Sequence, residues 1–205
     1  DQEIVTFESC DYTTSELEGC TDSQALNFNY LANQEDGSCT YFNCPNDFTP
    51  IAGTVFYPPS GSVDNGLNTQ LPVGIVGDWF EEYIQFYAPN EMEFDGTNIE
   101  FNYATITSID NLPDGLSYQC EPLSCSIIAS ELGCLGIFGI ATESGVFDLE
   151  ISASVSITYD AGILGDFDID FNIPYYGGNS LLDMAGIDQA TINSIIPQYT
   201  IIIQD

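Results

Sequence analysis

The chain has no basic side chain: its 205 residues include 32 Asp and Glu but no Lys, Arg or His. No ion pair between side chains can form within it, so each carboxylate depends on backbone N–H groups, hydroxyls, water or bound cations. The formal charge of −32 also opposes a compact state unless salt or divalent ions screen the repulsion. Such a chain folds only if its apolar residues bury a large core.

The apolar content is sufficient for that core. Hydrophobic residues make up 44% of the chain and aromatic residues 13%, far above the composition of disordered proteins. The length predicts one or two domains. No apolar run reaches the roughly 18 residues of a membrane-spanning helix, and the start at Asp1 is typical of a secreted chain that has already been processed.

The charge excludes several classes of function. Without cations, the surface is not expected to bind nucleic acid or an anionic membrane. The absence of His and Lys removes the usual general bases, the Ser–His and Cys–His pairs and Schiff-base chemistry. Carboxylate pairs such as Glu81 and Glu82 are the residues that hydrolyse glycosides, but chance alone produces such pairs in so acidic a chain. We therefore expect no catalytic activity.

Cysteine usage indicates an oxidising, extracellular compartment. Seven cysteines form one group of four and one group of three: Cys10, Cys20, Cys39, Cys44, Cys120, Cys125 and Cys134. Mixed Cys/His zinc sites are impossible here, and the first group lacks the C-x-x-C pairs of an all-cysteine zinc site. Disulfides are the better interpretation. Since seven is odd, one thiol is free or pairs with another chain.

The pattern changes at about residue 45, which predicts an acidic, cysteine-rich module over residues 1–44 and a β-sandwich over residues 45–205. The second part has short apolar or alternating runs that are divided by Gly, Pro, Asn and Asp, which is typical of all-β domains. The predicted strands are Gly53–Tyr57, Tyr83–Tyr87, Ile99–Ile109, Gly115–Gln119, Cys134–Ile140, Gly145–Ile157, Asp166–Ile173 and Tyr199–Gln204. Helical spacing over Ser180–Ile196 predicts one or two short helices that end before Pro197.

The segment Gly165–Asn172 alternates between acidic and apolar residues. As a strand, it would place Asp166, Asp168 and Asp170 on one solvated face. The D-x-D-x-D spacing also suggests a calcium loop, but Phe171 occupies the position where an EF-hand needs Gly. The strand is the favoured interpretation.

Two motif groups in the second part resemble a known family. The matching residues are Leu71, Pro72, Gly74, Val76 and Gly77, then Leu112, Pro113, Gly115, Leu116, Ser117, Tyr118, Cys120, Cys125, Gly133 and Cys134. This run resembles the immunoglobulin-like domains that are common in secreted and surface proteins of the Bacteroidetes. The resemblance covers roughly residues 45–160 and departs at Gly139–Thr142, where the family has a Gly-Thr-Pro turn. It implies an immunoglobulin-like β-sandwich that is exported to the bacterial surface by a sorting-domain route.

The segment Gly19–Cys39 is similar to a short acidic repeat, roughly G-C-T-D-x-x-A-x-N-Y-x-x-x-A-x-x-D-D-G-S-C, of secreted proteins from marine bacteria and some large viruses. The matching residues are Gly19, Cys20, Thr21, Asp22, Ala25, Asn27, Asn29, Ala32, Asp36, Gly37, Ser38 and Cys39. Phe28 precedes Asn29, and Glu35 replaces the first Asp of the pair. The function of this repeat is poorly defined, so the match transfers little chemistry.

Within this module Cys20 and Cys39 are the natural disulfide pair, which closes a loop of about 20 residues and stabilises it by roughly 3 kcal/mol. Cys10 and Cys44 could then close an outer ring. Oxygen ligands of the kind that calcium takes come from Asp22, Asn27, Asn29, Glu35 and Asp36. The alternative is that these side chains cap turns. In the second cysteine group we expect one disulfide within the loop, with the third cysteine reaching the N-terminal module.

Two non-catalytic functions lead. The chain could be a filament subunit that assembles by β-strand addition through Glu3–Phe7 and Tyr199–Ile203, with disulfides within or between subunits as the covalent links. It could instead be a module of a larger surface adhesin. A third candidate is a carbohydrate-binding module with an aromatic platform made of Trp79, Tyr83, Tyr87, Tyr175 and Tyr176. The expected partners are copies of the chain, other surface proteins or glycans.

Overall fold

The computed structural model describes residues 16–23, 25–45, 49, 55–64, 68–94 and 97–205. The predicted strand at Glu3–Phe7 therefore lies outside the described residues, as does Cys10. The chain divides into two compact units, the first ending at Phe42 and the second beginning at Asn43. The predicted boundary lay after Cys44; Asn43 and Cys44 fall in the second unit because Cys44 is bonded to Cys134 there.

Over its described residues, 16–23 and 25–42, the first unit has almost no apolar core. The regular structure in these residues is one parallel pair, β1 (Glu18–Gly19) with β2 (Gln34–Glu35). Cys20 and Ala25 are buried, and Leu26 and Phe42 are half-buried, but the other large apolar side chains described in this unit are exposed. They are Leu17, Phe28, Tyr30, Leu31 and Tyr41. The unit is thus held by a disulfide and polar contacts, as expected for so short a segment.

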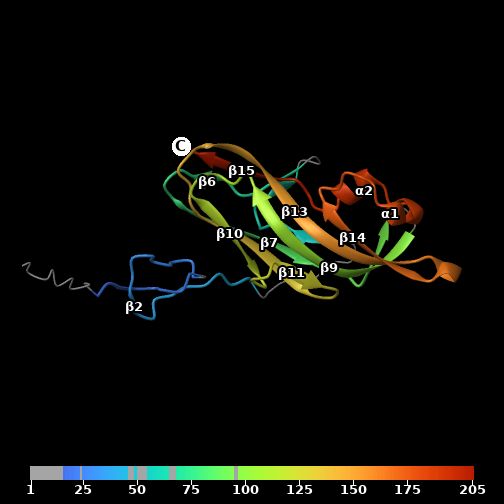
Figure 1. Cartoon of the computed structure of the whole chain (residues 1–205). Helices are drawn as coiled ribbons and strands as arrows, with labels where there is room; N and C mark the ends of the chain where they lie inside the picture. Colours follow the sequence, from blue (N-terminus) through green and yellow to red (C-terminus); the bar gives the residue numbers. More distant parts are fainter. Residues whose placement is uncertain (1–15, 24, 46–48, 50–54, 65–67, 95–96) are drawn as a thin grey trace, which may run out of the picture. The chain divides into compact units, whose positions relative to one another are not determined.

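The second unit is an immunoglobulin-like β-sandwich with a short helical insertion (Figure 1). Its strands are β3 (Phe56–Tyr57), β4 (Val63–Asp64), β5 (Thr69–Gln70), β6 (Gly74–Ile75), β7 (Trp79–Tyr87), β8 (Glu91–Phe94), β9 (Thr97–Asp110), β10 (Leu116–Glu121), β11 (Ser126–Ile128), β12 (Leu132–Ile140), β13 (Gly145–Asp160), β14 (Asp166–Ile173) and β15 (Tyr199–Gln204). One sheet has the order β10-β12-β7-β3. The other runs β11-β9-β13-β15-β5-β4, with β14, β6 and β8 paired at its sides.

The core between the two sheets follows from strand alternation. On β7, Phe80, Ile84 and Phe86 point inward and are buried, and they meet the inward side chains of β15, such as Ile201 and Ile203. All the predicted strands with described residues are present, and Asp166–Ile173 and Tyr199–Gln204 have the predicted bounds. The acidic face of β14 is also confirmed, because Asp166, Asp168 and Asp170 are exposed.

A second core lies beneath the helical insertion. The predicted helical region forms α1 (Ser180–Ala185) and α2 (Gln189–Asn193), preceded along the chain by the short helix η1 (Gly162–Leu164). Leu182 and Ile192 of these helices are buried against β13 and β14. Asp188 caps α2 by accepting a 2.7 Å hydrogen bond from the Thr191 backbone N–H, and this bond lowers the pKa of Asp188.

The C-terminal strand is not a free edge, so the expected route of strand addition through Tyr199–Ile203 is wrong. β15 pairs with β13 along one side and with β5 and β6 along the other. Tyr199, Thr200, Ile201 and Ile203 are buried. A strand whose backbone groups are bonded on both sides has none to offer a neighbouring chain. The uninterrupted apolar run Ile201–Ile203 is typical of a strand that lies in the interior of a sheet.

Candidate functional site

The predicted calcium ligands make hydrogen bonds within the first unit, some as turn caps and some across the loop. Glu35 accepts hydrogen bonds from the Thr21 backbone at 2.8 Å, the Thr21 hydroxyl at 2.9 Å and the Gly37 backbone at 2.8 Å. These bonds, the Thr21 backbone first, hold the pKa of Glu35 below its usual value. The Ser38 hydroxyl and backbone N–H lower the pKa of Asp36 in the same way.

The other three expected ligands are engaged as well. Asn27 donates to the Ser38 carbonyl at 2.7 Å and accepts from the Thr40 backbone at 2.8 Å. Asn29 accepts from the Leu31 backbone at 3.1 Å. The Tyr41 hydroxyl donates to Asp22 at 2.8 Å, which raises the pKa of Tyr41.

These contacts do not gather the ligand set at one point. Within the described part of the chain, the single cluster of three or more groups with metal-ligating spacing is Cys20, Glu35 and Cys39. Two of its three members are joined in a disulfide, so they offer no thiolate. Turn capping accounts for Asn29, Glu35 and Asp36, whereas Asp22 and Asn27 bond across the loop. Calcium binding by this loop stays a prediction.

Three disulfides are present among the described residues. Cys20–Cys39 is the pair that we expected in the first unit, and Cys120–Cys125 is the expected bond within the loop after β10. Cys134 is bonded to Cys44, which confirms that the third cysteine of the second group reaches the predicted N-terminal module, residues 1–44. The outer ring between Cys10 and Cys44 is therefore wrong. The reason is spatial: the segment at Cys44 runs beside β12, which brings it to Cys134 across 90 residues of sequence.

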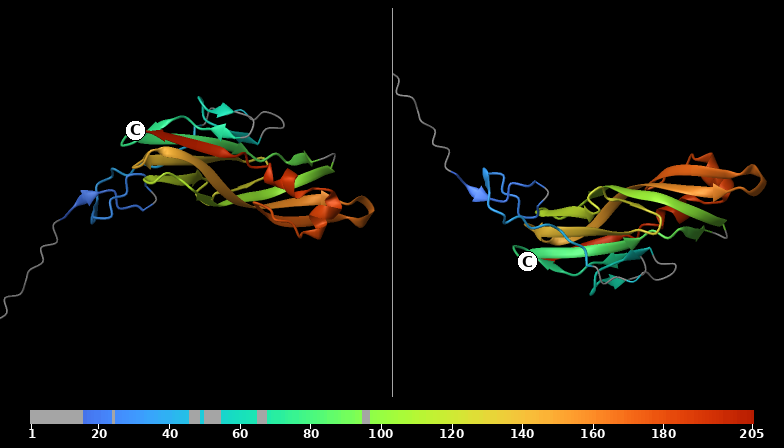
Figure 2. Two further views of the ribbon diagram at one scale, coloured as in Figure 1. Left: turned by 90° about the horizontal axis from the view of Figure 1, so that it is seen from above. Right: turned by 90° about the horizontal axis from the view of Figure 1, so that it is seen from below.

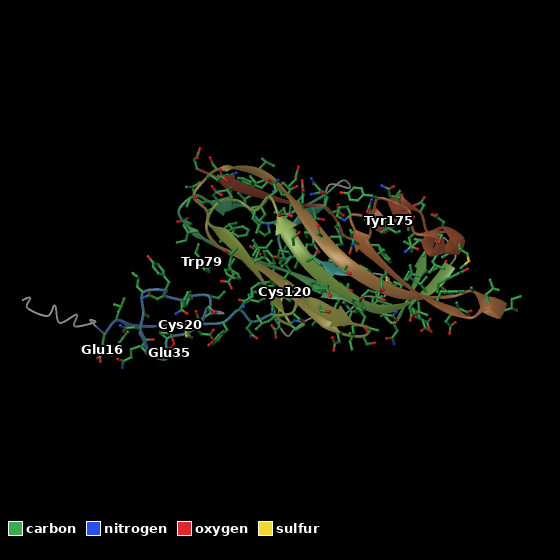
Figure 3. The ribbon with its side chains drawn as sticks, in the orientation of Figure 1. Glu16, Cys20, Glu35, Trp79, Cys120 and Tyr175 are labelled. Atoms are coloured by element: carbon green, nitrogen blue, oxygen red, sulfur yellow. A yellow bond between two sulfur atoms is a disulfide. The ribbon has the colours of Figure 1, made fainter. Side chains whose placement is uncertain are left out.

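The five predicted platform aromatics divide between two places. Tyr175 is buried in the second core, where its backbone exchanges hydrogen bonds with the Asn193 side chain. Figure 3 shows Tyr175 beside the helices and Trp79 toward the other end of the sandwich. Tyr176 follows Tyr175 in the chain and is 83% exposed. The two tyrosines after β14 thus do not belong to one platform with Trp79.

The remaining three aromatics share one face. Since alternate residues of a strand point to the same side, Trp79, Tyr83 and Tyr87 lie on the outer face of β7, opposite the buried side chains of the core. Trp79 is 53% exposed, and Tyr83 and Tyr87 are half-buried. The spacing of four residues separates successive rings by roughly 13 Å along the strand.

Strand β12 adds apolar side chains that the sequence analysis missed. In the register of the sheet, Ile140 lies opposite Trp79 and Phe138 lies opposite Glu81. The Phe138 ring stacks beside the Trp79 ring, with centroids 6.3 Å apart and planes 20° apart, and Ile140 is 49% exposed. In the run Leu132–Ile140, the residues that point to either side of the strand are apolar or Gly. This pattern is typical of a strand that is buried on both faces. No sequence signal showed that Phe138 and Ile140 face outward.

A buried glycine separates the aromatic residues of β7 from polar groups on β10. Gly136 lies between Tyr83 on β7 and Gln119 on β10, so the middle strand carries no side chain there. Ser117 lies opposite Phe138 in the same way. The Trp79 indole N–H donates to Glu81 at 3.0 Å, which fixes the ring and leaves carboxylate lone pairs for other donors. We call the residues Trp79, Glu81, Tyr83, Ser117, Gln119, Gly136, Phe138 and Ile140 the aromatic face.

Glu82 has a different environment, although it is next to Glu81. It points to the inner side of the sheet, opposite the fully buried Ile137. Burial, and secondarily the charge of Glu81, raises the pKa of Glu82. The carboxylate pair noted in the sequence is thus split between the two faces of β7, and the two groups cannot act on one substrate.

The segment after the first unit limits the aromatic face on one side. The Gln85 amide donates to the Pro45 carbonyl at 2.9 Å, and the Cys44 backbone donates to Glu121 at 2.8 Å. With the Cys44–Cys134 disulfide, these bonds hold the segment across the outer side of the sheet. Tyr87 and Leu132, which pair with each other, lie beyond this crossing. The open area is therefore the half of the sheet that contains Trp79.

The aromatic face has the chemistry of a saccharide-binding surface. Aromatic rings pack against the C–H groups on the flat side of a sugar, while carboxylate, amide and hydroxyl groups at the rim bond to its hydroxyls. Because the chain has no cation, an anionic sugar would find no partner there.

Comparisons with known proteins do not assign the chain to a family. No family model matches the chain, and no curated protein matches it. Among solved structures, the chain is similar to the ASH/PapD-like domain of human CEP192 (PapD-like domain 7), at 11% identity and a TM-score of 0.24, over 64% of this chain and 90% of that one. At this TM-score the likeness carries no information on function.

Proposed function

We propose that this chain is a non-catalytic, extracellular adhesive module of the bacterial surface and that its aromatic face binds neutral glycans. The observation that carries the proposal is the group formed by exposed Trp79 and Ile140 with half-buried Phe138 on an outer sheet face, bordered by Glu81 and Gln119. Surface-exposed aromatic groups with polar rims are typical of recognition sites.

The extracellular setting rests on the disulfides. Three are present among the described residues, and such bonds persist in oxidising compartments. Among the same residues no helix is long and apolar enough to cross a membrane. Assembly into filaments is the less favoured function, because β15 has no free edge. Self-association would need another surface.

The test is a glycan array followed by calorimetric titration with the glycans that bind. We expect binding to neutral oligosaccharides and none to sialylated or sulfated ones. Trp79→Ala should weaken binding at least tenfold, since a central aromatic side chain is typically a dominant contact. Tyr176→Ala is the matched control, because it removes an exposed aromatic ring outside the aromatic face and should leave affinity unchanged.

Two results would refute the proposal. One is an array without any neutral glycan. The other is an equal loss of affinity in the Trp79→Ala and Tyr176→Ala variants, which would show that exposed aromatic rings bind sugars without regard to place. Negative-stain microscopy and light scattering of the same protein, with calcium and with chelator, should show a monomer in both conditions; regular fibres would favour the filament function instead.

A further inference from the structure

A long β-hairpin ends in two exposed aliphatic side chains. β13 and β14 pair as far as Asp160 and Asp166, and residues 161–165 connect them. In Figures 1 and 2 this connection reaches the far end of the sandwich, beyond the helices. Ile163 is 104% exposed and Leu164 is 67% exposed. Of the exposed apolar side chains in the described residues, Ile163 has the largest exposed fraction.

The loop holds these side chains in a defined position. The Ala161 backbone donates to the Gly165 carbonyl at 3.1 Å, and Gly165 donates to the Gly162 carbonyl at 3.0 Å. The Gly162 N–H donates to the Asp160 carboxylate at 2.6 Å. Gly162 and Gly165 have φ of 63° and 84°, a left-handed conformation that only Gly adopts without strain. A loop closed in this way can present Ile163 and Leu164 to a partner without first having to order them.

Carboxylates surround the base of this loop. A cavity of about 190 Å³ is lined by Glu91, Glu100, Asp160 and Asp166, together with Asn98 and Thr158. The strand registers place Glu91 opposite Glu100 and Asp160 opposite Asp166, and like charges in such pairs repel. No side chain of this protein can neutralise them, since it has no Lys, Arg or His.

We propose that residues 160–166 form a docking knob for a protein partner that has an apolar pocket beside Lys or Arg. Ile163 and Leu164 enter the pocket, and the basic side chain enters the acidic cavity at the base of the loop. Charge complementarity selects this partner. A second copy of the chain cannot supply the cation, and an anionic lipid surface is repelled. The knob is separate from the aromatic face and does not depend on glycan binding.

The test is an amide NMR titration of the whole ¹⁵N-labelled chain with three short synthetic peptides, alternating Leu/Lys, Ser/Lys and Leu/Glu. We expect the Leu/Lys peptide to shift the amides of Asp160, Gly162, Ile163, Leu164 and Gly165 first. The Ser/Lys peptide should bind at least tenfold more weakly at these amides, and the Leu/Glu peptide should not bind. The double variant Ile163→Ser/Leu164→Ser should reduce the Leu/Lys affinity at least tenfold.

Val146→Ser is the matched control, because Val146 on β13 is also 67% exposed but lies far from the loop along that strand. It should leave the affinity unchanged, and an otherwise unchanged amide spectrum will show that each variant is folded. Shifts spread evenly over the acidic surface, or a double variant that binds like the parent, would overturn the proposal. Concentration-dependent shifts of the loop without peptide would assign it to self-association. Sedimentation with phosphatidylcholine vesicles that depends on Ile163 and Leu164 would assign it to lipid.

Discussion

Removing the Cys44–Cys134 disulfide should destabilise the second unit far more than removing Cys120–Cys125. The two bonds span 90 and 5 residues. In the chain-entropy description, a cross-link stabilises by restricting the unfolded chain, and these spans correspond to roughly 4.6 and 2.1 kcal/mol at 25 °C. Both cysteines of the Cys44–Cys134 pair are buried, whereas Cys125 of the other pair is half-buried, so lost packing acts in the same direction. The loop lengths alone predict a difference of about 2.5 kcal/mol, which is therefore a lower bound.

The assay is urea unfolding of the paired Cys→Ala variants, followed by the emission of Trp79 and by circular dichroism. Urea is needed because guanidinium would screen the charge of −32. Both variants should carry Cys10→Ser so that no free thiol exchanges with the remaining bonds. The Cys44–Cys134 variant should also have the larger m-value, since its unfolded state is more expanded. Equal losses of stability in the two variants would refute the loop-length argument.

Three further predictions concern charge and packing. Glu82→Gln should stabilise the protein at pH 7 by about 0.5 kcal/mol but not below pH about 4. The raised pKa of Glu82 means that folding favours its protonated form, so its contribution to stability is lost as pH rises. The control is Glu93→Gln, because Glu93 is exposed and lies opposite an uncharged residue, Asn98. Gly115→Ala should cost at least about 2 kcal/mol, because its φ is 91° and a Cβ would lie 2.1 Å from the Ile140 carbonyl oxygen. Gly177→Ala has a similar φ of 89° with open space and should cost less; equal losses would disprove the clash. Sodium chloride should raise the thermal midpoint of unfolding by screening the repulsion between carboxylates. Calcium at matched ionic strength tests the predicted ligand loop. A saturable increase in the thermal midpoint that is lost in Asp36→Asn would support calcium binding there, and no increase would count against it.

The sequence predicted the larger elements of the second unit because their patterns are local. Alternation over Asp166–Ile173 fixed that strand to the residue. Two-residue strands such as β4, β5 and β6 have no period to detect. β5 and β6 form by pairing with β15, and β4 forms by pairing with β5. Without knowledge of these strands, β15 was mistaken for a free edge.

The candidate site was predictable only in part. Trp79, Tyr83 and Tyr87 are spaced by four residues, and any strand places side chains at this spacing on one face. The sequence therefore predicted that these three side chains share a face. Phe138 and Gln119 join them through pairing between strands that are distant in sequence. The bond between Cys44 and Cys134 is equally non-local. The sequence predicted that a cysteine of the second group reaches the N-terminal module, but it paired Cys44 with Cys10.

The central claim is that the aromatic face binds neutral glycans, and the most direct measurement is a titration of tryptophan emission. Trp79 is the single tryptophan of the chain, and it lies on that face, so the signal reports this surface alone. We predict a saturable change in emission with the neutral oligosaccharides that bind on the array, with the same affinity as in calorimetry. Binding in the calorimeter with no change in Trp79 emission at saturation would place the glycan elsewhere and contradict the account.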